Sequence, residues 1–128
     1  MILDTHVFLW FVHDDPALSN DLKDLIESRR DQIYISPISF WEIAMLAEKG
    51  RISTRGQSVS SFVRNLATNY GTHEAPFNNE IALLSRTLEF THSDPADRFI
   101  AATAKYLGMP LMTVDEQLAN LPWLNTIS

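Results

Sequence analysis

Short apolar segments alternate with helix-length segments along the whole chain, and this alternation constrains the fold more than any other feature. Residues 33–35 and 111–114 are typical of buried strands, because they are short, apolar and rich in β-branched side chains. Helical patterns stand between such segments and are punctuated by capping residues and glycines. The alternation predicts an α/β fold, with a central parallel sheet of four to five short strands and helices on both faces.

Capping residues and prolines indicate where the helices begin. A Ser-Pro pair at positions 36–37 suits an N-cap and a first helical position, so a helix is expected over residues 37–49. An Asp-Pro pair at positions 94–95 repeats this signal ahead of a helix that Gly108 ends. The other expected elements are a strand at 2–3 that enters a helix over 7–12, a helix from about residue 20, a helix between 58 and 71, an extended segment at 73–76, a helix over 80–87 and an edge strand within 123–127.

Length and composition are those of one globular domain spanning residues 1–128. The chain is 45% hydrophobic and 20% charged, so a folded core is expected and disorder is not. The absence of cysteine excludes disulfides, thiolate zinc sites and a cysteine nucleophile. No apolar segment is long enough to span a membrane, and the first residues lack the basic start of a signal peptide. A cytoplasmic protein with no membrane partner is therefore expected.

The net charge of −6 at first argues against binding to nucleic acid, whose phosphates are usually met by Lys and Arg. A metal bound by several of the sixteen acids would, however, make the site itself attractive to phosphate. The bases are also unevenly placed, since four of the ten fall in a stretch where Glu48 is the only acid: Lys49, Arg51, Arg55 and Arg64. This stretch is either a solvated surface or a strip that meets an anionic ligand or partner.

Four acidic residues, far apart in the chain, each stand where a strand ends or a helix begins. Asp4 follows the first expected strand, and Asp115 follows the segment 111–114. Glu42 and Asp97 lie within the first two turns of helices that begin at the same edge of the sheet. We expect the four carboxylates to converge within coordinating distance of a cation.

Each of these carboxylates also has a purely structural interpretation. Asp4 and Asp115 can serve as helix N-caps. Asp97 can pair with Asp94 in an arrangement like a capping box. Glu42 can form a salt bridge, although it lies in a mainly apolar helix, where an unpaired ionised group is costly.

A cluster of carboxylates predicts Mg²⁺ or Mn²⁺, because oxygen ligands favour these ions over zinc. Such an ion relieves the repulsion between the acids and can activate water for in-line attack on phosphorus. His6 and His92 either orient a carboxylate or touch phosphate, or they take part in local capping and packing. Two alternatives stay open: a phosphatase with Asp4 as a covalent nucleophile, which usually requires an acid where His6 stands, and a non-catalytic RNA- or protein-binding module.

Four motifs occur in order along the chain: LDTH at 3–6 followed by LW at 9–10, SPISFWEIA at 36–44 closed by KGR at 49–51, HSDPADR at 92–98 continuing into AATA at 101–104, and TVD at 113–115. Together they resemble the motifs of PIN-domain ribonucleases, specifically the VapC-like toxins of type II toxin–antitoxin pairs. The resemblance implies that the family's acids fall on Asp4, Glu42, Asp97 and Asp115. Asp94 is a close rival of Asp97, and Asp115 is expected to be a weaker or water-mediated ligand.

The resemblance also implies an activity and partners. It predicts a Mg²⁺- or Mn²⁺-dependent endoribonuclease that cuts RNA, is inhibited by a cognate antitoxin protein, and forms a homodimer or a toxin–antitoxin hetero-oligomer. The stretch from Lys49 to Arg64 and the apolar helix face at Phe62 and Leu66 become candidates for contact with the antitoxin, with RNA or with both. The motif residues expected to support the site are Thr5, His6, Ser39, Asp94, Arg98 and Thr113.

Overall fold

Parallel strands form the centre of the computed structural model, which describes residues 1–91 and 94–128. Within these residues the sheet has five strands of two residues each, in the order β3-β2-β1-β4-β5. Ile2 in the central strand pairs with Tyr34 on one side and with Leu111 on the other. The α/β fold and the parallel sheet expected from the alternation are thus confirmed. The strands are β1 (Ile2–Leu3), β2 (Tyr34–Ile35), β3 (His73–Glu74), β4 (Leu111–Met112) and β5 (Thr126–Ile127).

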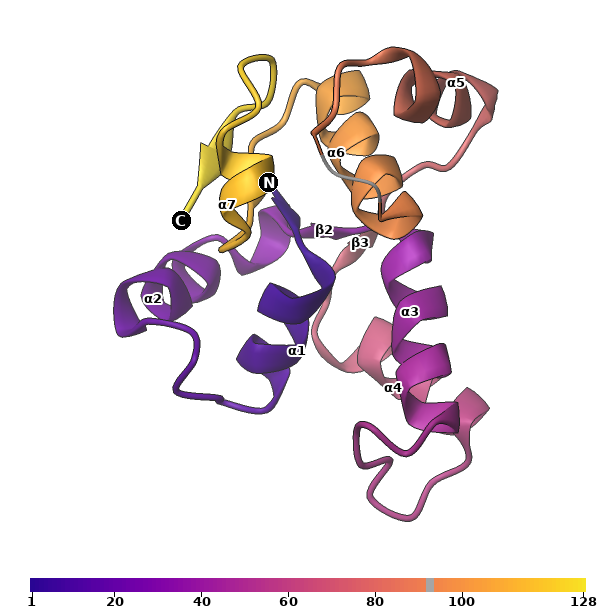
Figure 1. The fold of residues 1–128 in the computed structure, drawn as a ribbon. Helices are drawn as coiled ribbons and strands as arrows, with labels where there is room; N and C mark the ends of the chain where they lie inside the picture. The colour runs from indigo at the N-terminus through magenta and orange to yellow at the C-terminus, as the bar shows by residue number, and fades with distance from the viewer. Residues whose placement is uncertain (92–93) are drawn as a thin grey trace.

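Each face of the sheet contributes to its own apolar core, because successive strand residues point to opposite faces. Leu3 and Met112 belong to a buried cluster with side chains from the helices that follow β1 and β2. Ile2 and Leu111 belong to a second buried cluster, which includes Ile100 and other residues of the C-terminal third. Helices therefore cover both faces, as predicted (Figure 1).

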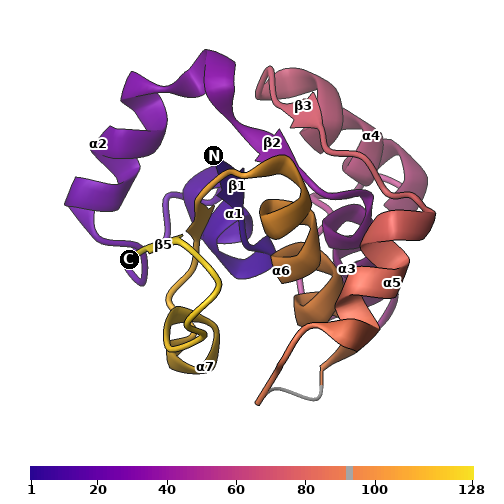
Figure 2. The ribbon, with the colours of Figure 1, turned by 90° about the horizontal axis from the view of Figure 1, so that it is seen from above.

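Different helices pack on the two faces of the sheet. Those of the N-terminal half pack on the first cluster, whereas α6 packs on the second. Figure 2 shows α5 on the outer side of α6, away from β1. The helices are α1 (Thr5–Val12), α2 (Asn20–Ser28), α3 (Pro37–Glu48), α4 (Val59–Asn69), α5 (Asn79–Thr87), α6 (Pro95–Leu107) and α7 (Glu116–Ala119), with a 3₁₀ turn at Arg30–Gln32.

The predicted capping signals are present where the helices begin and end. The Ser36 side chain accepts a hydrogen bond from the backbone N–H of Ile38, and proline follows it at the first helical position of α3. Gly108 ends α6 with a φ of 65°, a left-handed conformation that glycine adopts without strain. Local sequence signals therefore set the ends of the two helices that carry Glu42 and Asp97.

Two expectations about local structure need correction. Strand β4 ends at Met112, so Thr113 and Val114 lie beyond the expected strand and lead into α7. Phe62 and Leu66, predicted as an apolar helix face for contact with the antitoxin, with RNA or with both, are only 4% and 5% exposed. They pack into the first core cluster instead, because the α4 stripe faces the sheet, and they offer no surface to an antitoxin or to RNA.

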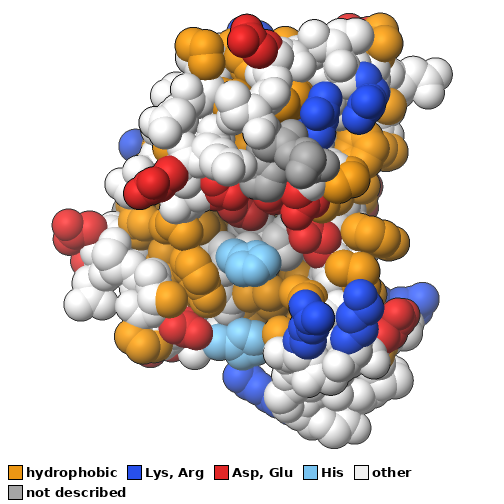
Figure 3. Space-filling model, in the orientation of Figure 1, with side chains coloured by type: hydrophobic (Ala, Val, Ile, Leu, Met, Phe, Trp, Pro, Cys, Tyr) orange, Lys and Arg blue, Asp and Glu red, His pale blue; other side chains and the backbone are white. Residues whose placement is uncertain are grey.

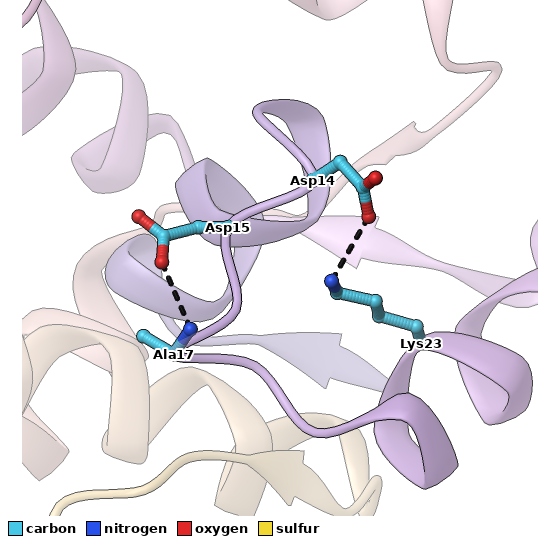
Figure 4. A network of polar contacts seen from close by, with 4 residues as sticks. All are labelled: Asp14, Asp15, Ala17 and Lys23. Carbon is cyan, nitrogen blue, oxygen red and sulfur yellow. Dashed lines mark hydrogen bonds and ion pairs between the residues drawn. The ribbon is translucent and has the colours of Figure 1, made fainter.

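The loop between α1 and α2 is held by its own polar contacts (Figure 4). Asp14, which has a φ of 50°, forms an ion pair with Lys23 at 2.9 Å. The carboxylate of Asp15 accepts a hydrogen bond from the backbone N–H of Ala17 at 2.8 Å. None of the helices in the described part of the chain is long and apolar enough to cross a membrane.

Candidate active site

The order of the strands indicates where this fold offers a ligand site. The chain fills one side of β1 with β2 and β3, and then crosses over to place β4 and β5 on the other side. In parallel α/β sheets, ligands bind beyond the carboxyl ends of the strands at such a change of direction. Asp4 follows β1 and Thr113 follows β4, so both residues stand at this point.

A cavity of about 400 Å³ opens at this edge of the sheet. It brings together the four acids predicted to converge, and adds Asp94 to them. Figure 3 shows the red Asp and Glu side chains in a row across this face, with a His side chain directly below them. The lining residues are Asp4, His6, Trp10, Glu42, Asp94, Asp97, Val114 and Asp115.

Asp4 is the most buried of the cavity carboxylates, with 7% of its surface exposed. It occupies the N-cap position of α1, yet its side chain makes no capping hydrogen bond. Its Oδ2 accepts instead from the hydroxyl of Thr113 at 2.8 Å. The N–H groups of Thr5 and His6 at the start of α1 act on the same carboxylate, so capping explains the position of Asp4 only in part. The predicted supporting role of Thr113 has a direct structural basis.

Burial raises the pKa of Asp4 above its ordinary value. The Thr113 hydroxyl, the charge of His6 and the backbone N–H groups at the start of α1 oppose this shift without cancelling it. A buried carboxylate held in this way gains from a nearby cation.

Glu42 is half-buried and is held by the hydroxyl of Thr5, which in turn contacts the hydroxyl of Ser39. Thr5 donates a hydrogen bond to its Oε1 at 2.6 Å, and the hydroxyls of Thr5 and Ser39 lie 2.8 Å apart. Thr5 has a single hydroxyl proton, which is engaged by Glu42, so Ser39 must be the donor to Thr5. No Lys or Arg forms an ion pair with Glu42 among the described residues, so the expected salt-bridge alternative is not found there.

The pKa of Glu42 is also raised. Burial is the main cause, opposed by the hydrogen bond from Thr5. The negative charges of Asp94 and Asp4 raise it further, which places these three carboxylates within electrostatic reach of one another.

Asp94 and Asp115 combine a capping role with a place in the cavity. The Oδ1 of Asp94 accepts from the backbone N–H of Ala96 at 2.9 Å, at the start of α6. The Oδ1 of Asp115 accepts from the N–H of Gln117 at 2.8 Å, at the start of α7. The capping interpretation is thus right for Asp115, and both carboxylates still line the cavity.

Asp97 lies in the first turn of α6, half-buried, and lines the same cavity as Asp94. Both candidates for the direct metal ligand, Asp94 and Asp97, therefore lie at the site. Asp94 also caps α6, and Asp97 follows it in the first turn of the helix. The preference for Asp97 as a direct metal ligand stays a prediction.

The other predicted supporting residues divide into two groups. His6 lines the cavity, and its ring meets that of Trp10 edge-on with centroids 6.1 Å apart. Arg98 instead lies against α5, where its Nε donates to the carbonyl of Ser85 at 2.8 Å and its guanidinium covers the ring of Phe90. His92 lies outside the residues that the structure describes.

Trp10 and Val114 line the cavity without having been predicted as site residues. Trp10 follows His6 by four positions, so both fall on one face of α1. The four-residue spacing between His6 and Trp10 was the sequence signal that could have placed Trp10 at the site. Val114 stands between Thr113 and Asp115, and its 44% exposure follows from the early end of β4.

The donor set fits a hydrated divalent cation better than a tightly caged one. Among the described residues, no three Asp, Glu or His side chains stand close enough to form a ready-made ligand cluster. Mg²⁺ usually keeps several waters and takes one or two protein carboxylates. A cavity of about 400 Å³ has room for an ion with such waters, and its acids supply the oxygen ligands that Mg²⁺ and Mn²⁺ prefer.

Comparison with known proteins assigns the family. The family model for the PIN domain matches residues 1–124. Ribonuclease VapC22 of Mycobacterium tuberculosis is 34% identical over 119 residues, which cover 92% of this chain and 88% of that protein. The chain therefore belongs to the PIN-domain family, and within it to the VapC-like proteins.

Solved structures show the same fold over nearly the whole chain. VapBC2 from Rickettsia felis, bound to a DNA fragment from its promoter, matches with a TM-score of 0.69 at 16% identity, covering 98% of this chain and 96% of that one. A toxin–antitoxin complex from Klebsiella pneumoniae matches with a TM-score of 0.66 at 22% identity, covering 99% and 95%. At these identities the similarity establishes the shared fold.

Proposed function

We propose that this protein is the toxin of a toxin–antitoxin pair, a Mg²⁺- or Mn²⁺-dependent endoribonuclease that hydrolyses RNA phosphodiester bonds. The observation that carries the proposal is the gathering of five carboxylates around one cavity at the carboxyl edge of the sheet. Burial raises the pKa values of two of them, Asp4 and Glu42, and the charges of Asp94 and Asp4 raise that of Glu42 further. The similarity to Ribonuclease VapC22 supports the same activity.

The carboxylates that would hold the ion are Asp4, Glu42 and Asp97, with Asp115 as a weaker or water-mediated ligand. A divalent ion bound there would activate water for attack on phosphorus and would neutralise charge on the leaving oxygen. The chain's own hydroxyl groups fix the acids for this task. Thr113 orients Asp4, and the pair of Ser39 and Thr5 orients Glu42.

Two other residues that line the cavity suit the rest of a nucleotide. Trp10 offers an aromatic surface on which a base can stack, and such stacking does not depend on sequence. His6 is exposed beside it and can donate to a phosphate oxygen. The site thus has groups for the metal, the phosphate and a base.

Cleavage of RNA by the purified full-length protein tests the proposal. We expect the wild type to cleave RNA in Mg²⁺ or Mn²⁺ and not in EDTA. The Asp4→Asn and Asp97→Asn variants should not cleave RNA, although their thermal stability should equal or exceed that of the wild type. Asp21→Asn is a control that should retain cleavage, because Asp21 is exposed at the start of α2 and does not line the cavity. Full cleavage by Asp97→Asn would transfer the role to Asp94, and full cleavage by both acid variants would overturn the proposal.

The partners form part of the same proposal. The structural relatives include toxin–antitoxin complexes, which supports a cognate antitoxin for this protein. A homodimer is proposed as well, and an apolar groove beside the cleft supports it. This groove is lined by Ile38 and Trp41 of α3 and by Pro95, Ala96 and Phe99 of α6, and Trp41 is 60% exposed.

Light scattering measures the oligomeric state directly. The wild type should have the mass of a dimer, and Trp41→Ser should shift it toward the monomer. Leu83→Ser is a matched control, because Leu83 is 55% exposed on α5 and lies outside the groove. A monomeric wild type would contradict the dimer without affecting the assignment of the cleft.

A further inference from the structure

Four basic side chains follow one another in the sequence between the end of α3 and the middle of α4. Lys49, Arg51, Arg55 and Arg64, here called the basic corner, are all exposed, and no acid lies between Lys49 and Arg64 in the sequence. This concentration of positive charge occurs in a chain whose net charge is −6. A local field of the opposite sign to that of the whole protein attracts an anionic ligand to this surface.

The backbone holds the basic corner in a defined position. The N–H of Arg51 donates to the carbonyl of Leu46 at 2.9 Å, and the N–H of Gly50 donates to that of Ala47 at 3.1 Å. With Gly50 at a φ of 68°, these two bonds form a Schellman motif, which fixes the end of α3. Lys49 and Arg51 therefore project from an ordered turn.

The basic corner is not neutralised within the described part of the protein. Lys23 and Arg30 form ion pairs with Asp14 and Glu27, the first of which is visible in Figure 4. None of the four corner residues forms such a pair there. Their charges are available to a ligand.

Helix α3 connects the basic corner to the cleft. Lys49 stands seven positions after Glu42, which at the helical rise corresponds to about 10 Å along the axis. Figure 3 shows Lys and Arg side chains over the α3–α4 end, below the row of acids, with one acidic side chain next to them and one His side chain between the two levels. A short single strand that passes through the cleft can reach both.

We propose that the basic corner binds the phosphates of the single-stranded RNA segment that flanks the bond to be cut, an inference that rests on the proposed ribonuclease function. The cleft itself is lined by five carboxylates and repels a polyanion, apart from the phosphate that a cation would hold. Binding must therefore be supplied by positive charge outside the cleft, and the basic corner supplies it on the α3 side. Trp10 in the cavity wall gives the strand an aromatic contact along the way.

The dependence of RNA binding on salt tests this proposal. Each phosphate neutralised on a single strand contributes about −0.7 to the slope of log K against log salt. The full-length protein carrying Asp4→Asn, which leaves the RNA uncut, is titrated with a labelled single-stranded oligonucleotide by fluorescence anisotropy in Mg²⁺. Adding Lys49→Gln and Arg51→Gln should flatten the slope by about 1.4 and weaken binding roughly twenty-fold at 0.1 M salt.

A matched pair of charge deletions provides the control. Arg29 and Lys105 are both exposed. Each stands at or near the end of a helix that leads into the start of a strand, so both lie toward the edge of the sheet opposite the cleft. Arg29→Gln with Lys105→Gln removes the same charge and should leave the slope unchanged. Equal effects of the two pairs would overturn the proposal, because they would reflect net charge alone.

The remaining outcomes are also decisive. A wild type that cuts RNA while Lys49→Gln with Arg51→Gln leaves RNA binding unchanged overturns this inference but not the proposed function. If this double variant binds RNA normally but no longer binds the antitoxin, the basic corner is an antitoxin contact, and the inference is likewise overturned. A flattened slope in a protein that never cuts RNA supports the corner and rejects the ribonuclease.

Discussion

Replacing Thr113 by valine removes the hydroxyl that holds Asp4 and keeps the shape of the side chain. Thr113 is completely buried, donates to Asp4 Oδ2 at 2.8 Å and accepts from the N–H of Asp115 at 3.1 Å. A hydrogen bond to a charged group contributes about 1.5–3 kcal/mol, and an orphaned buried polar group costs about 1–3 kcal/mol. Because Asp115 is only half-buried, we expect a total loss near 2–4 kcal/mol, a large part of the roughly 5–15 kcal/mol that stabilises a domain.

Urea unfolding at neutral pH measures this loss, with Thr113→Ser as the control. Serine keeps the hydroxyl and loses one methyl group, which costs about 1 kcal/mol. Thr113→Val should therefore be at least about 1 kcal/mol less stable than Thr113→Ser. The gap should narrow in acid, because a protonated Asp4 needs the donor less. Equal stability of the two variants at neutral pH would refute the reasoning.

Three further predictions concern the charge, the orientation and the framework of the site. In EDTA, the free energy of unfolding should fall as the pH rises from the unfolded pKa values of Asp4 and Glu42, about 3.8 and 4.5, through their raised folded values. In that pH range the folded protein binds more protons than the unfolded protein does, so a rise in pH favours unfolding. Thermal unfolding between about pH 4 and 8 should show less of this loss in the Asp4→Asn/Glu42→Gln variant, and Mg²⁺ should reduce it in the wild type. Thr5→Val should reduce cleavage about tenfold or more while Thr5→Ser retains it, as measured by initial rates, because only the hydroxyl reaches Glu42. Gly108→Ala should cost about 1–2 kcal/mol in urea unfolding with no change in metal binding, since its φ is 65° and an added Cβ meets no atom within 4 Å.

The architecture was predictable because its signals are local. The Ser-Pro pair at 36–37 and the Asp-Pro pair at 94–95 start α3 and α6 where expected, and a left-handed glycine follows each helix. The arrival of the four acids at one cavity was also predictable, because the carboxyl ends of parallel strands share one edge. The expected convergence within coordinating distance of a cation is not found among the described residues. The order of the strands was not, since it depends on which pairs of distant segments bury the most apolar surface.

The detail of the site depends on contacts between residues far apart in the chain. The hydroxyl of Thr113 reaches Asp4 across 109 positions, and that of Thr5 reaches Glu42 across 37. Neither partner can be read from spacing, and the same holds for Arg98, which lies against α5 rather than in the cleft. Periodicity likewise could not show that the apolar face of α4 is buried in the core.

Calorimetric titration of Mn²⁺ tests most directly whether the acidic cleft is a metal site. The wild type should bind Mn²⁺, and the Asp4→Asn/Asp97→Asn variant should bind it at least tenfold more weakly or not at all. The matched Asp21→Asn/Asp24→Asn variant should bind Mn²⁺ as the wild type does, because both of these acids are exposed on α2 and neither lines the cavity. Equal binding by the wild type and the double acid variant, or no binding by either, would contradict the assignment of the cleft as the metal-dependent centre of the protein.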